Sequence, residues 1–264
     1  MRIWAVANQK GGVGKTTTSV NLAGLLASQE NSVLLVDFDP QGSLTSYFGY
    51  NPDVIDHSAY HLFQRHSVRV ENLILNTGIS GLDLLPASSA LATLDRQLGA
   101  QAGKGLVLAN ALKEVEARYT HVLIDCPPVL GVLMVNALAA CQQLLVPVQT
   151  DFLALRGLER MTQTLTMMKR SLNKKLPYTI IPTMFDRRTR ASAESLKELQ
   201  QSYPKELWPS VIPVDTQFRE SSRMGVPLTA LNPRSRGALA YQELLWTLED
   251  ERSEDEAELE EKLA

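Results

Sequence analysis

The chain has 264 residues, of which 44% are hydrophobic and 21% are charged, and its formal net charge is −3. This length and composition are sufficient for a single globular domain with a substantial core. Two cysteines are too few for a disulfide framework, and no apolar run approaches the ~18 residues of a membrane-spanning helix. The sequence therefore excludes a disulfide-stabilised scaffold and a membrane-spanning protein. Because the first residues already have the pattern of a strand, we expect no signal peptide.

Acidic charge is concentrated at the end of the chain. Residues 249–264 carry nine acidic and two basic side chains, a net charge of −7, which leaves +4 for residues 1–248. A block of like charge buries little surface and is usually solvated. We therefore predict one domain over residues 1–248, followed by a frayed or disordered acidic tail over residues 249–264.

Patterns of strand and helix alternate along the chain. The predicted strands span residues 2–7, 32–37, 72–75, 82–85, 121–126, 142–148, 178–184 and 210–213. The predicted helices span residues 15–28, 87–98, 106–118, 132–140, 155–171, 191–202 and 236–248. Residues 41–70 are mixed and polar, with fragments of helix. This alternation predicts a single α/β domain with a mostly parallel, twisted sheet and helices on both faces.

A glycine-rich segment lies between the first predicted strand and the first predicted helix. Backbone N–H groups in such a loop cradle phosphate oxygens, and the following helix N-terminus adds partial positive charge. Lys15 can reach the β- and γ-phosphates, and the Thr16 hydroxyl can bind Mg²⁺. The segment predicts a site for a nucleoside triphosphate. Its residues are Lys10, Gly11, Gly12, Val13, Gly14, Lys15, Thr16 and Thr17.

The segment departs from the usual P-loop pattern at two positions. Gln9 stands where the pattern has glycine, and a second lysine, Lys10, precedes the glycines. A lone lysine is usually a solvated surface residue. Inside a phosphate loop, we favour an anion-binding role for Lys10.

Carboxylates end two further predicted strands. Asp37 and Asp39 follow the apolar run of residues 33–36, and Asp125 ends the strand of residues 121–126. Residues two apart on a strand share a face, and parallel α/β sheets bind ligands at the carboxyl ends of their strands. Asp39 also begins an Asp-Pro-Gln-Gly turn, which is compatible with a second role at the phosphates.

These three motifs, in this order, resemble the ParA/MinD family of P-loop ATPases. Residues 10–17 are similar to that family's deviant Walker A motif, and Asp125 occupies the place of its Walker B carboxylate. The resemblance implies ATP and Mg²⁺ as ligands, slow ATP hydrolysis, and a homodimer that closes around ATP. It also implies that Lys10 reaches across the dimer to the partner's nucleotide.

The resemblance assigns roles to individual side chains. Asp39 would orient the attacking water, Asp37 would support the magnesium shell, and Asp125 would hold the ion directly or through water. The implied catalytic residues are Lys10, Lys15 and Asp39. The implied metal-binding residues are Thr16, Asp37, Asp39 and Asp125. Outside the loop, the implied nucleotide contacts are Pro213 and Asp215.

Two short stretches, residues 124–128 and 189–192, resemble an orphan branch of the family called ParC. That branch positions chemotaxis arrays at the cell pole, whereas other members partition plasmids or chromosomes. The resemblance implies an activating partner, either ParB-like or a chemotaxis adaptor. It places the protein in the cytoplasm, at the nucleoid or at the pole. The acidic tail has the wrong sign for an anionic membrane, so we expect no membrane insertion.

Basic residues cluster late in the chain, where ParA proteins carry arginines that bind DNA without sequence preference. Such contacts act on phosphates and release counterions. Val214 and Gln217 stand where many ParA proteins have arginine, and the alternative is a set of solvated surface pairs. The candidate DNA-binding residues are Arg187, Arg188, Arg190, Arg219 and Arg223.

Two other classes of protein share features with this chain. An electron-transfer protein of the nitrogenase iron protein type has a similar loop but needs cysteines that bridge a cluster across the dimer. We instead expect Cys126 and Cys141 to be buried thiols. A metabolic P-loop ligase would need a second substrate pocket, for which the sequence offers no candidate.

Overall fold

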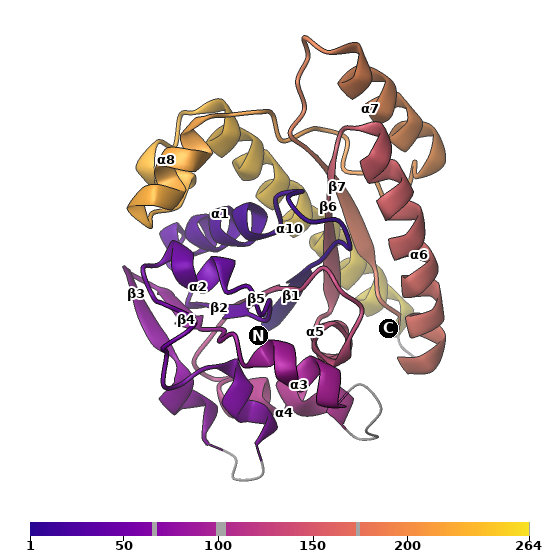
Figure 1. The fold of residues 1–264 in the computed structure, drawn as a ribbon. Coiled ribbons are helices and arrows are strands. Elements are labelled where there is room, and N and C mark those ends of the chain that lie inside the picture. The colour runs from indigo at the N-terminus through magenta and orange to yellow at the C-terminus, as the bar shows by residue number, and fades with distance from the viewer. Residues whose placement is uncertain (65–67, 99–103, 173–174, 264) are drawn as a thin grey trace.

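The computed structural model describes residues 1–64, 68–98, 104–172 and 175–263 (Figure 1). In this part of the chain, seven strands form one sheet in the order β3-β4-β2-β5-β1-β6-β7. All neighbouring strands are parallel except β3 and β4. The strands are β1 (Arg2–Val6), β2 (Val33–Asp37), β3 (Leu75–Ile79), β4 (Leu82–Leu85), β5 (His121–Asp125), β6 (Gln143–Gln149) and β7 (Tyr178–Thr183). The predicted α/β class with a mostly parallel sheet is confirmed.

Helices cover both faces of the sheet (Figure 1). One hydrophobic cluster packs α1 and α10 against one face, and a second packs α4, α5 and α6 against the other. The helices are α1 (Lys15–Ser28), α2 (Ser43–Tyr47), α3 (Leu91–Leu98), α4 (Val107–Glu114), α5 (Val132–Ala140), α6 (Phe152–Leu172), α7 (Arg190–Ser202), α8 (Gln217–Met224), α9 (Leu228–Leu231) and α10 (Arg236–Leu263). Short 3₁₀ helices span Ala59–Phe63, Val70–Leu73 and Lys104–Leu106.

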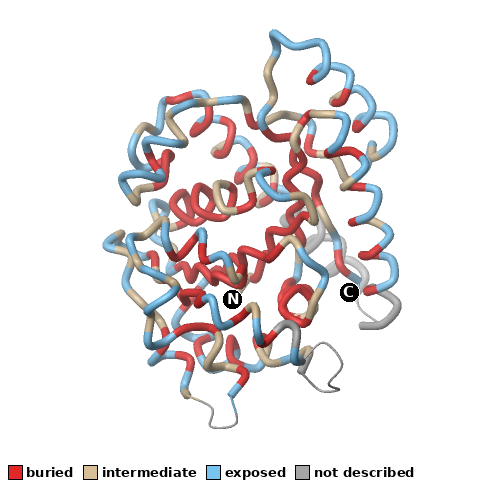
Figure 2. The backbone as a smooth tube through the Cα atoms, viewed as in Figure 1, coloured by how far each residue is buried: buried red, intermediate tan, exposed pale blue. Residues whose placement is uncertain are grey.

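The central strands are buried along their whole length. All five residues of β2 and of β5 are buried, as expected for parallel strands that are covered on both faces. Side chains of β1 alternate between the two clusters: Ile3 and Ala5 pack on one side, Trp4 and Val6 on the other. Figure 2 shows that burial is most continuous in these strands and in α1.

The order of the strands brings the sequence motifs to one edge of the sheet. β5 lies between β2 and β1, and Asp125 is in register with both Asp37 and Val6. The loops that follow β1, β2 and β5 therefore leave the sheet at neighbouring points. This is the edge where open α/β sheets bind ligands.

One predicted strand is displaced and another is wrong. The strand predicted over residues 72–75 begins only at Leu75, because Val70–Leu73 forms a 3₁₀ helix whose spacing buries Val70 and Leu73 in the core. Residues 210–213 make one isolated bridge, between Pro213 and Phe185, in the described chain. Prolines at both ends of that segment, Pro209 and Pro213, cannot donate hydrogen bonds to a ladder.

The last helix continues into the acidic segment. α10 extends over Arg236–Leu263, whereas the sequence predicted a helix that ends at residue 248. Leu244, Leu245 and Leu248 anchor its first half in the core. The division into a domain and a frayed tail stays a prediction. Among the helices of the described chain, none combines the length and apolarity needed to cross a membrane.

Candidate nucleotide-binding site

The glycine-rich loop connects β1 to α1 and has the backbone shape of a phosphate cradle. Gly12 and Gly14 have φ angles of 73° and 94°, a region that disfavours side chains. The hydroxyl of Thr183, the last residue of β7, donates a hydrogen bond of 2.8 Å to the Val13 carbonyl. The loop is thus held by a hydrogen bond from β7, which lies two strands away from β1 in the sheet.

Lys15 and Thr16, at the start of α1, face the carboxylates of the sheet edge. The Thr16 hydroxyl donates a 2.6 Å hydrogen bond to Asp125 Oδ2. Lys15 is only 8% exposed, and its positive charge lowers the pKa values of Asp39 and Asp125 against the larger effect of burial, which raises them. The structure thereby brings together the P-loop residues and both acidic motifs that the sequence predicted.

Three carboxylates in this site have raised pKa values. Burial raises the pKa of Asp37 to about 7 and that of Asp125 to about 8, and for Asp125 the negative charge of Asp37 adds to the effect. Burial also raises the pKa of Asp39. The site thus concentrates acidic groups with too little positive charge around them.

A magnesium ion fits this deficit of positive charge. Asp125 Oδ1 is buried and has no hydrogen-bond partner, so an acceptor oxygen is left over beside the Thr16 hydroxyl. Mg²⁺ prefers such oxygen ligands and is commonly coordinated by one or two carboxylates together with the phosphates of a nucleotide. No three His, Cys, Asp or Glu side chains converge as a metal site by themselves within the described ranges. Thr16 and Asp125 are the residues that would hold the ion.

Asp37 and Asp39 are arranged differently from one another. The Asp37 carboxylate already accepts three hydrogen bonds, two of them from Thr45 and one from the Asp39 N–H. Asp39 accepts a hydrogen bond from the Gln41 N–H, so the predicted turn is present, and its side chain is mostly buried. The magnesium and water-orienting roles of these two residues stay predictions.

A cavity of about 590 Å³ opens beside the loop. Pro213 and Asp215 line it together with Gly14, Thr17, Tyr47 and Arg219. The Asp215 carboxylate caps two helices: Oδ1 accepts from Gln217 N–H in α8, and Oδ2 accepts from Gly237 N–H in α10. Asp215 therefore shapes the wall of this cavity through the helices that it holds, and its contact with a nucleotide stays a prediction.

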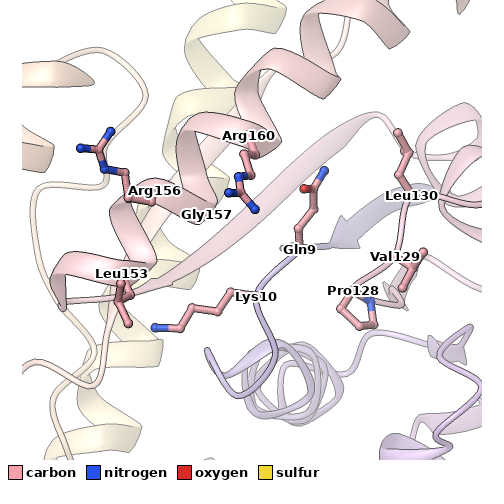
Figure 3. Close-up of a pocket in the computed structure, with 9 residues that line it drawn as sticks. All are labelled: Gln9, Lys10, Pro128, Val129, Leu130, Leu153, Arg156, Gly157 and Arg160. Carbon is pink, nitrogen blue, oxygen red and sulfur yellow. The ribbon is translucent and has the colours of Figure 1, made fainter.

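Lys10 lies beside the loop at a second cavity, of about 600 Å³ (Figure 3). Its ammonium group is 3.0 Å from Asp151 Oδ2 and 3.4 Å from Gln149 Oε1. In Figure 3 the side chain points toward Leu153 of α6 and away from Gln9. The family resemblance implies that Lys10 reaches across a dimer, whereas in this structure Lys10 forms an ion pair with Asp151 of its own chain.

The predicted DNA-binding arginines fall into two groups. Arg187, Arg188 and Arg190 lie at the β7–α7 connection, whereas Arg219 and Arg223 lie on α8, and Figure 1 shows α7 and α8 at opposite ends of the molecule's upper edge. Several of these arginines form surface ion pairs within the chain, as the alternative interpretation of the sequence expected. The pairs are Arg188–Asp186, Arg190–Glu194 and Arg223–Glu220.

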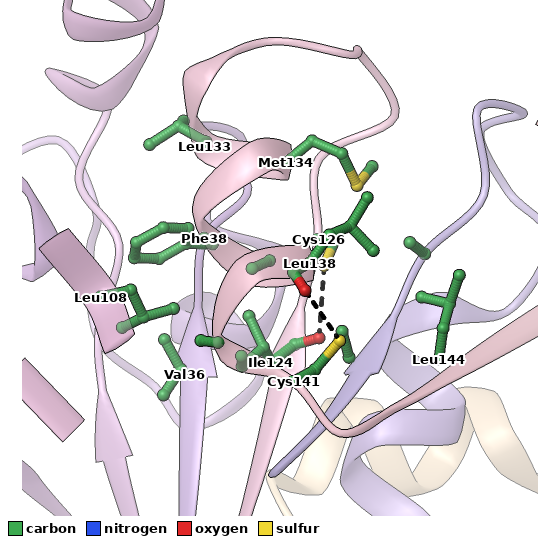
Figure 4. Close-up of a cluster of buried hydrophobic side chains, with 14 of the residues drawn as sticks. Val36, Phe38, Leu108, Ile124, Cys126, Leu133, Met134, Leu138, Cys141 and Leu144 are labelled. Atoms are coloured by element: carbon green, nitrogen blue, oxygen red, sulfur yellow. Dashed lines mark hydrogen bonds between the residues drawn. The ribbon is translucent and has the colours of Figure 1, made fainter. Parts of the chain in front are cut away.

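The two cysteines are buried in the core. Cys126 and Cys141 are both 0% exposed, and Figure 4 shows them packed among Ile124, Leu138 and Leu144. Each thiol donates a weak hydrogen bond to a backbone carbonyl of its own segment. Burial raises the pKa of the Cys126 thiol well above its usual range. These thiols are placed for packing, as predicted.

Sequence reasoning missed several polar residues of the site. Thr45, Gln149, Asp151 and Thr183 each contact a predicted residue or the loop. Asp151 and Thr183 lie more than a hundred residues from their partners, so no local pattern points to them. For Thr45, the nearest signal is its place in the first turn of a short helix after Asp-Pro-Gln-Gly.

Comparisons with known proteins agree with this architecture. The AAA domain family matches residues 1–178. The sporulation initiation inhibitor protein Soj of Bacillus subtilis is 37% identical over 244 residues, which cover 92% of this chain and 96% of Soj. The chromosome partitioning protein ParA of Myxococcus xanthus is 36% identical over 91% of this chain and 85% of its own length.

A solved structure is also similar over nearly the whole chain. The structure of cobyrinic acid a,c-diamide synthase from Mycobacterium smegmatis with bound ATP analogue and magnesium is 35% identical, with a TM-score of 0.81. The match covers 94% of each chain. Together with the loop, the acidic strand ends and the sheet order, these similarities show that the chain belongs to the ParA/MinD-like family of P-loop ATPases.

Proposed function

We propose that this protein binds ATP with Mg²⁺ and hydrolyses it slowly to ADP and phosphate, as a molecular switch. The observation that carries the proposal is the contact between Thr16 and Asp125, beside a buried carboxylate oxygen without a partner. That arrangement lies at the mouth of a loop shaped by Gly12 and Gly14. The similar Mycobacterium smegmatis protein holds an ATP analogue and magnesium, which supports the same ligands here.

Each residue of the site has one task in this proposal. The backbone of residues 11–16 and the Lys15 ammonium bind the phosphates. Thr16 and Asp125 hold the ion, which when bound neutralises charge on the phosphates. Asp39 orients the water that attacks the terminal phosphate. Catalysis of this kind depends mainly on positioning and electrostatic stabilisation.

We further propose that ATP closes a homodimer. Lys10 lies at the surface beside exposed apolar side chains that line the same cavity, of which Val129 is 62%, Leu130 44% and Leu153 69% exposed. Exposed apolar side chains gathered around a cavity are typical of surfaces that meet a partner. In the closed dimer, Lys10 leaves Asp151 and reaches the partner's nucleotide.

The cellular task that we propose is positioning or partitioning of a large cargo. Support comes from the relatives named for chromosome partitioning and from the resemblance to the branch that positions chemotaxis arrays. Cargo is a polar chemotaxis array, a plasmid or a chromosome, and an adaptor or ParB-like protein stimulates hydrolysis. The dimer travels on nonspecific DNA in the cytoplasm, at the nucleoid or near the pole.

Two other functions can be weighed against the structure. Cysteines buried at 0% exposure cannot bridge a cluster between subunits without unfolding the core, which disfavours the electron-transfer alternative. An ATP-dependent synthase is the second candidate, because a similar structure carries that name. A synthase couples ATP to a second substrate, whereas a switch turns over ATP alone and responds to its partner or to DNA.

Steady-state hydrolysis of ATP by the full chain with Mg²⁺ tests the proposal. We expect slow turnover without any second substrate, and loss of ATP affinity by about 100-fold in Lys15→Ala, because a charge-assisted contact with phosphate is removed. Arg69→Ala is the matched control, since Arg69 is an exposed cation paired with Glu71. Absence of ATP binding in the unmodified protein, or unchanged affinity in Lys15→Ala, would contradict the proposal.

A further inference from the structure

The loop that carries Asp39 is closed by a clasp between Asp37 and Thr45. Asp37 ends β2, and Thr45 lies in the first turn of α2, eight residues later. The N–H and the hydroxyl of Thr45 each donate a hydrogen bond of 2.7 Å to Asp37 Oδ2. The other oxygen, Oδ1, accepts from the Asp39 N–H at 3.2 Å. One buried carboxylate therefore joins the beginning and the end of the loop.

The Thr45 hydroxyl also ties the loop to a third segment. It accepts a 2.8 Å hydrogen bond from the N–H of Ala87, which follows β4. Thr45, Asp37 and Ala87 are all 0% exposed. A buried hydroxyl that donates to one partner and accepts from another leaves no polar group unsatisfied. Removal of this hydroxyl would leave the Ala87 N–H without its acceptor.

Within the loop, the contacts that we identify are local. The Asp39 carboxylate accepts from the Gln41 N–H at 3.0 Å, and the Asp39 carbonyl accepts from the Gly42 N–H at 2.8 Å. Gly42 has a φ of 61° and leaves no room for a side chain against Pro52. These contacts shape the turn around Asp39, whereas the clasp fixes where that turn stands relative to β2 and the phosphate loop.

We propose that Thr45 is a positioning residue for ATP hydrolysis, because its hydroxyl closes the loop on Asp37 and so holds Asp39 at the phosphate loop. The proposal rests on the proposed function, in which Asp39 orients the attacking water. Thr45 touches neither the water nor the phosphates in this account. Its effect should therefore fall on kcat and leave the binding of ATP nearly unchanged.

The test compares Thr45→Val, which keeps the shape but lacks the hydroxyl, with Thr45→Ser, which keeps the hydroxyl. We expect Thr45→Val to lower kcat by about 10- to 100-fold, since misplacement of a reacting group by about 1 Å has effects of this size. ATP affinity measured by calorimetry should change by less than about threefold. Thr45→Ser should retain kcat within about twofold. If Thr45→Val does not fold, Thr45→Ala replaces it in the test, and we expect the same loss of kcat.

Thr179→Val is the matched control. Thr179 is also buried, accepts a 3.2 Å hydrogen bond from Gln143, and lies near the start of β7, at the end of the strand opposite the site. Thr179→Val removes a buried hydroxyl, so it should lower thermal stability without lowering kcat. Wild-type kcat in Thr45→Val, a parallel loss of ATP affinity, or equal damage in Thr45→Ser would overturn the proposal.

Hydrogen exchange of the nucleotide-free protein tests the clasp independently of catalysis. The amides of Asp39, Gln41 and Gly42 should exchange at least about tenfold faster in Thr45→Val, while amides of β2 keep their protection. Unchanged exchange in this loop overturns the clasp even if the protein has no ATPase activity. Failure of the wild-type protein to turn over ATP, together with faster exchange of the loop, would refute the proposed function and leave the clasp supported.

Discussion

Lys10 and Asp151 form an ion pair within one chain, with Nζ and Oδ2 3.0 Å apart. Asp151 also accepts a hydrogen bond from the Ala154 N–H and so caps the start of α6. Burial raises the pKa of Asp151, but the contacts with Lys10 and the helix outweigh it and lower the pKa overall. The lysine must exchange this partner for a phosphate before it can act on a second subunit.

Lys10→Ala should leave ATP affinity within about threefold of the wild type and abolish the dimer, because the proposed task of Lys10 lies across the interface. Asp151→Asn should have the opposite effect, a larger dimer fraction at a given ATP concentration, since the amide keeps the cap but not the charge. Calorimetry and sedimentation check both. Stable dimers of Lys10→Ala with ATP would disprove the role of this lysine.

Asp39→Ala should retain ATP binding and lose turnover by about 100-fold or more, as expected when the group that orients water is removed. Phosphate release measured at saturating ATP checks this. Gln41→Ala is the control, because only its backbone N–H contacts Asp39. Normal turnover in Asp39→Ala would remove Asp39 from the mechanism.

Stability of the nucleotide-free protein should fall as pH rises from about 5 to about 8. The pKa values of Asp37 and Asp125 are raised to about 7 and about 8, so the folded state binds more protons than the unfolded state in this range. Stability is then full below the unfolded pKa and is lost as pH rises through the folded pKa. Mg²⁺ with ADP should therefore raise the melting temperature more at pH 8 than at pH 6. Equal shifts at both pH values, by scanning calorimetry, would contradict this.

Truncation after residue 250 should change the melting temperature by less than about 2 °C and leave ATP turnover intact, because a block of like charge buries little. The buried residues of α10 that anchor the helix, such as Leu245 and Leu248, are retained. Differential scanning calorimetry checks this. A large drop in melting temperature would show that the acidic part of α10 packs on the domain or on a second copy.

Arg188→Glu should weaken DNA binding equally for all sequences and leave basal ATP turnover unchanged. Arg188 is exposed and pairs with Asp186, so binding of a phosphate costs only a surface ion pair. Affinity should fall with salt by about 0.9 in log K per unit of log salt for each phosphate neutralised. Arg69→Glu is the control, because Arg69 is a similarly exposed, ion-paired arginine outside both arginine groups. Equal effects of the two variants would argue against a DNA surface at the β7–α7 connection.

The fold and the phosphate loop follow from local sequence, whereas the partners of the site do not. The helix at Lys15–Ser28 was predicted at its observed bounds, because the glycines before it leave one place for its start. Asp37 and Asp125 could be placed together because parallel strands end at one edge. Asp151 and Lys10 are 141 residues apart in the sequence, and no local pattern or motif predicts their contact. The erroneous strand at residues 210–213 shows that a short apolar segment beside prolines can make backbone hydrogen bonds and one isolated bridge at the end of β7 without forming a strand.

Light scattering of Asp39→Ala with ATP and with ADP tests whether ATP closes the dimer. This variant should keep the phosphate cradle and lack hydrolysis, so that the ATP-bound state accumulates. We expect a dimer of about twice 29.2 kDa with ATP and Mg²⁺, and a monomer with ADP. A monomer under both conditions, or the same dimer with either nucleotide, would contradict an ATP-dependent switch.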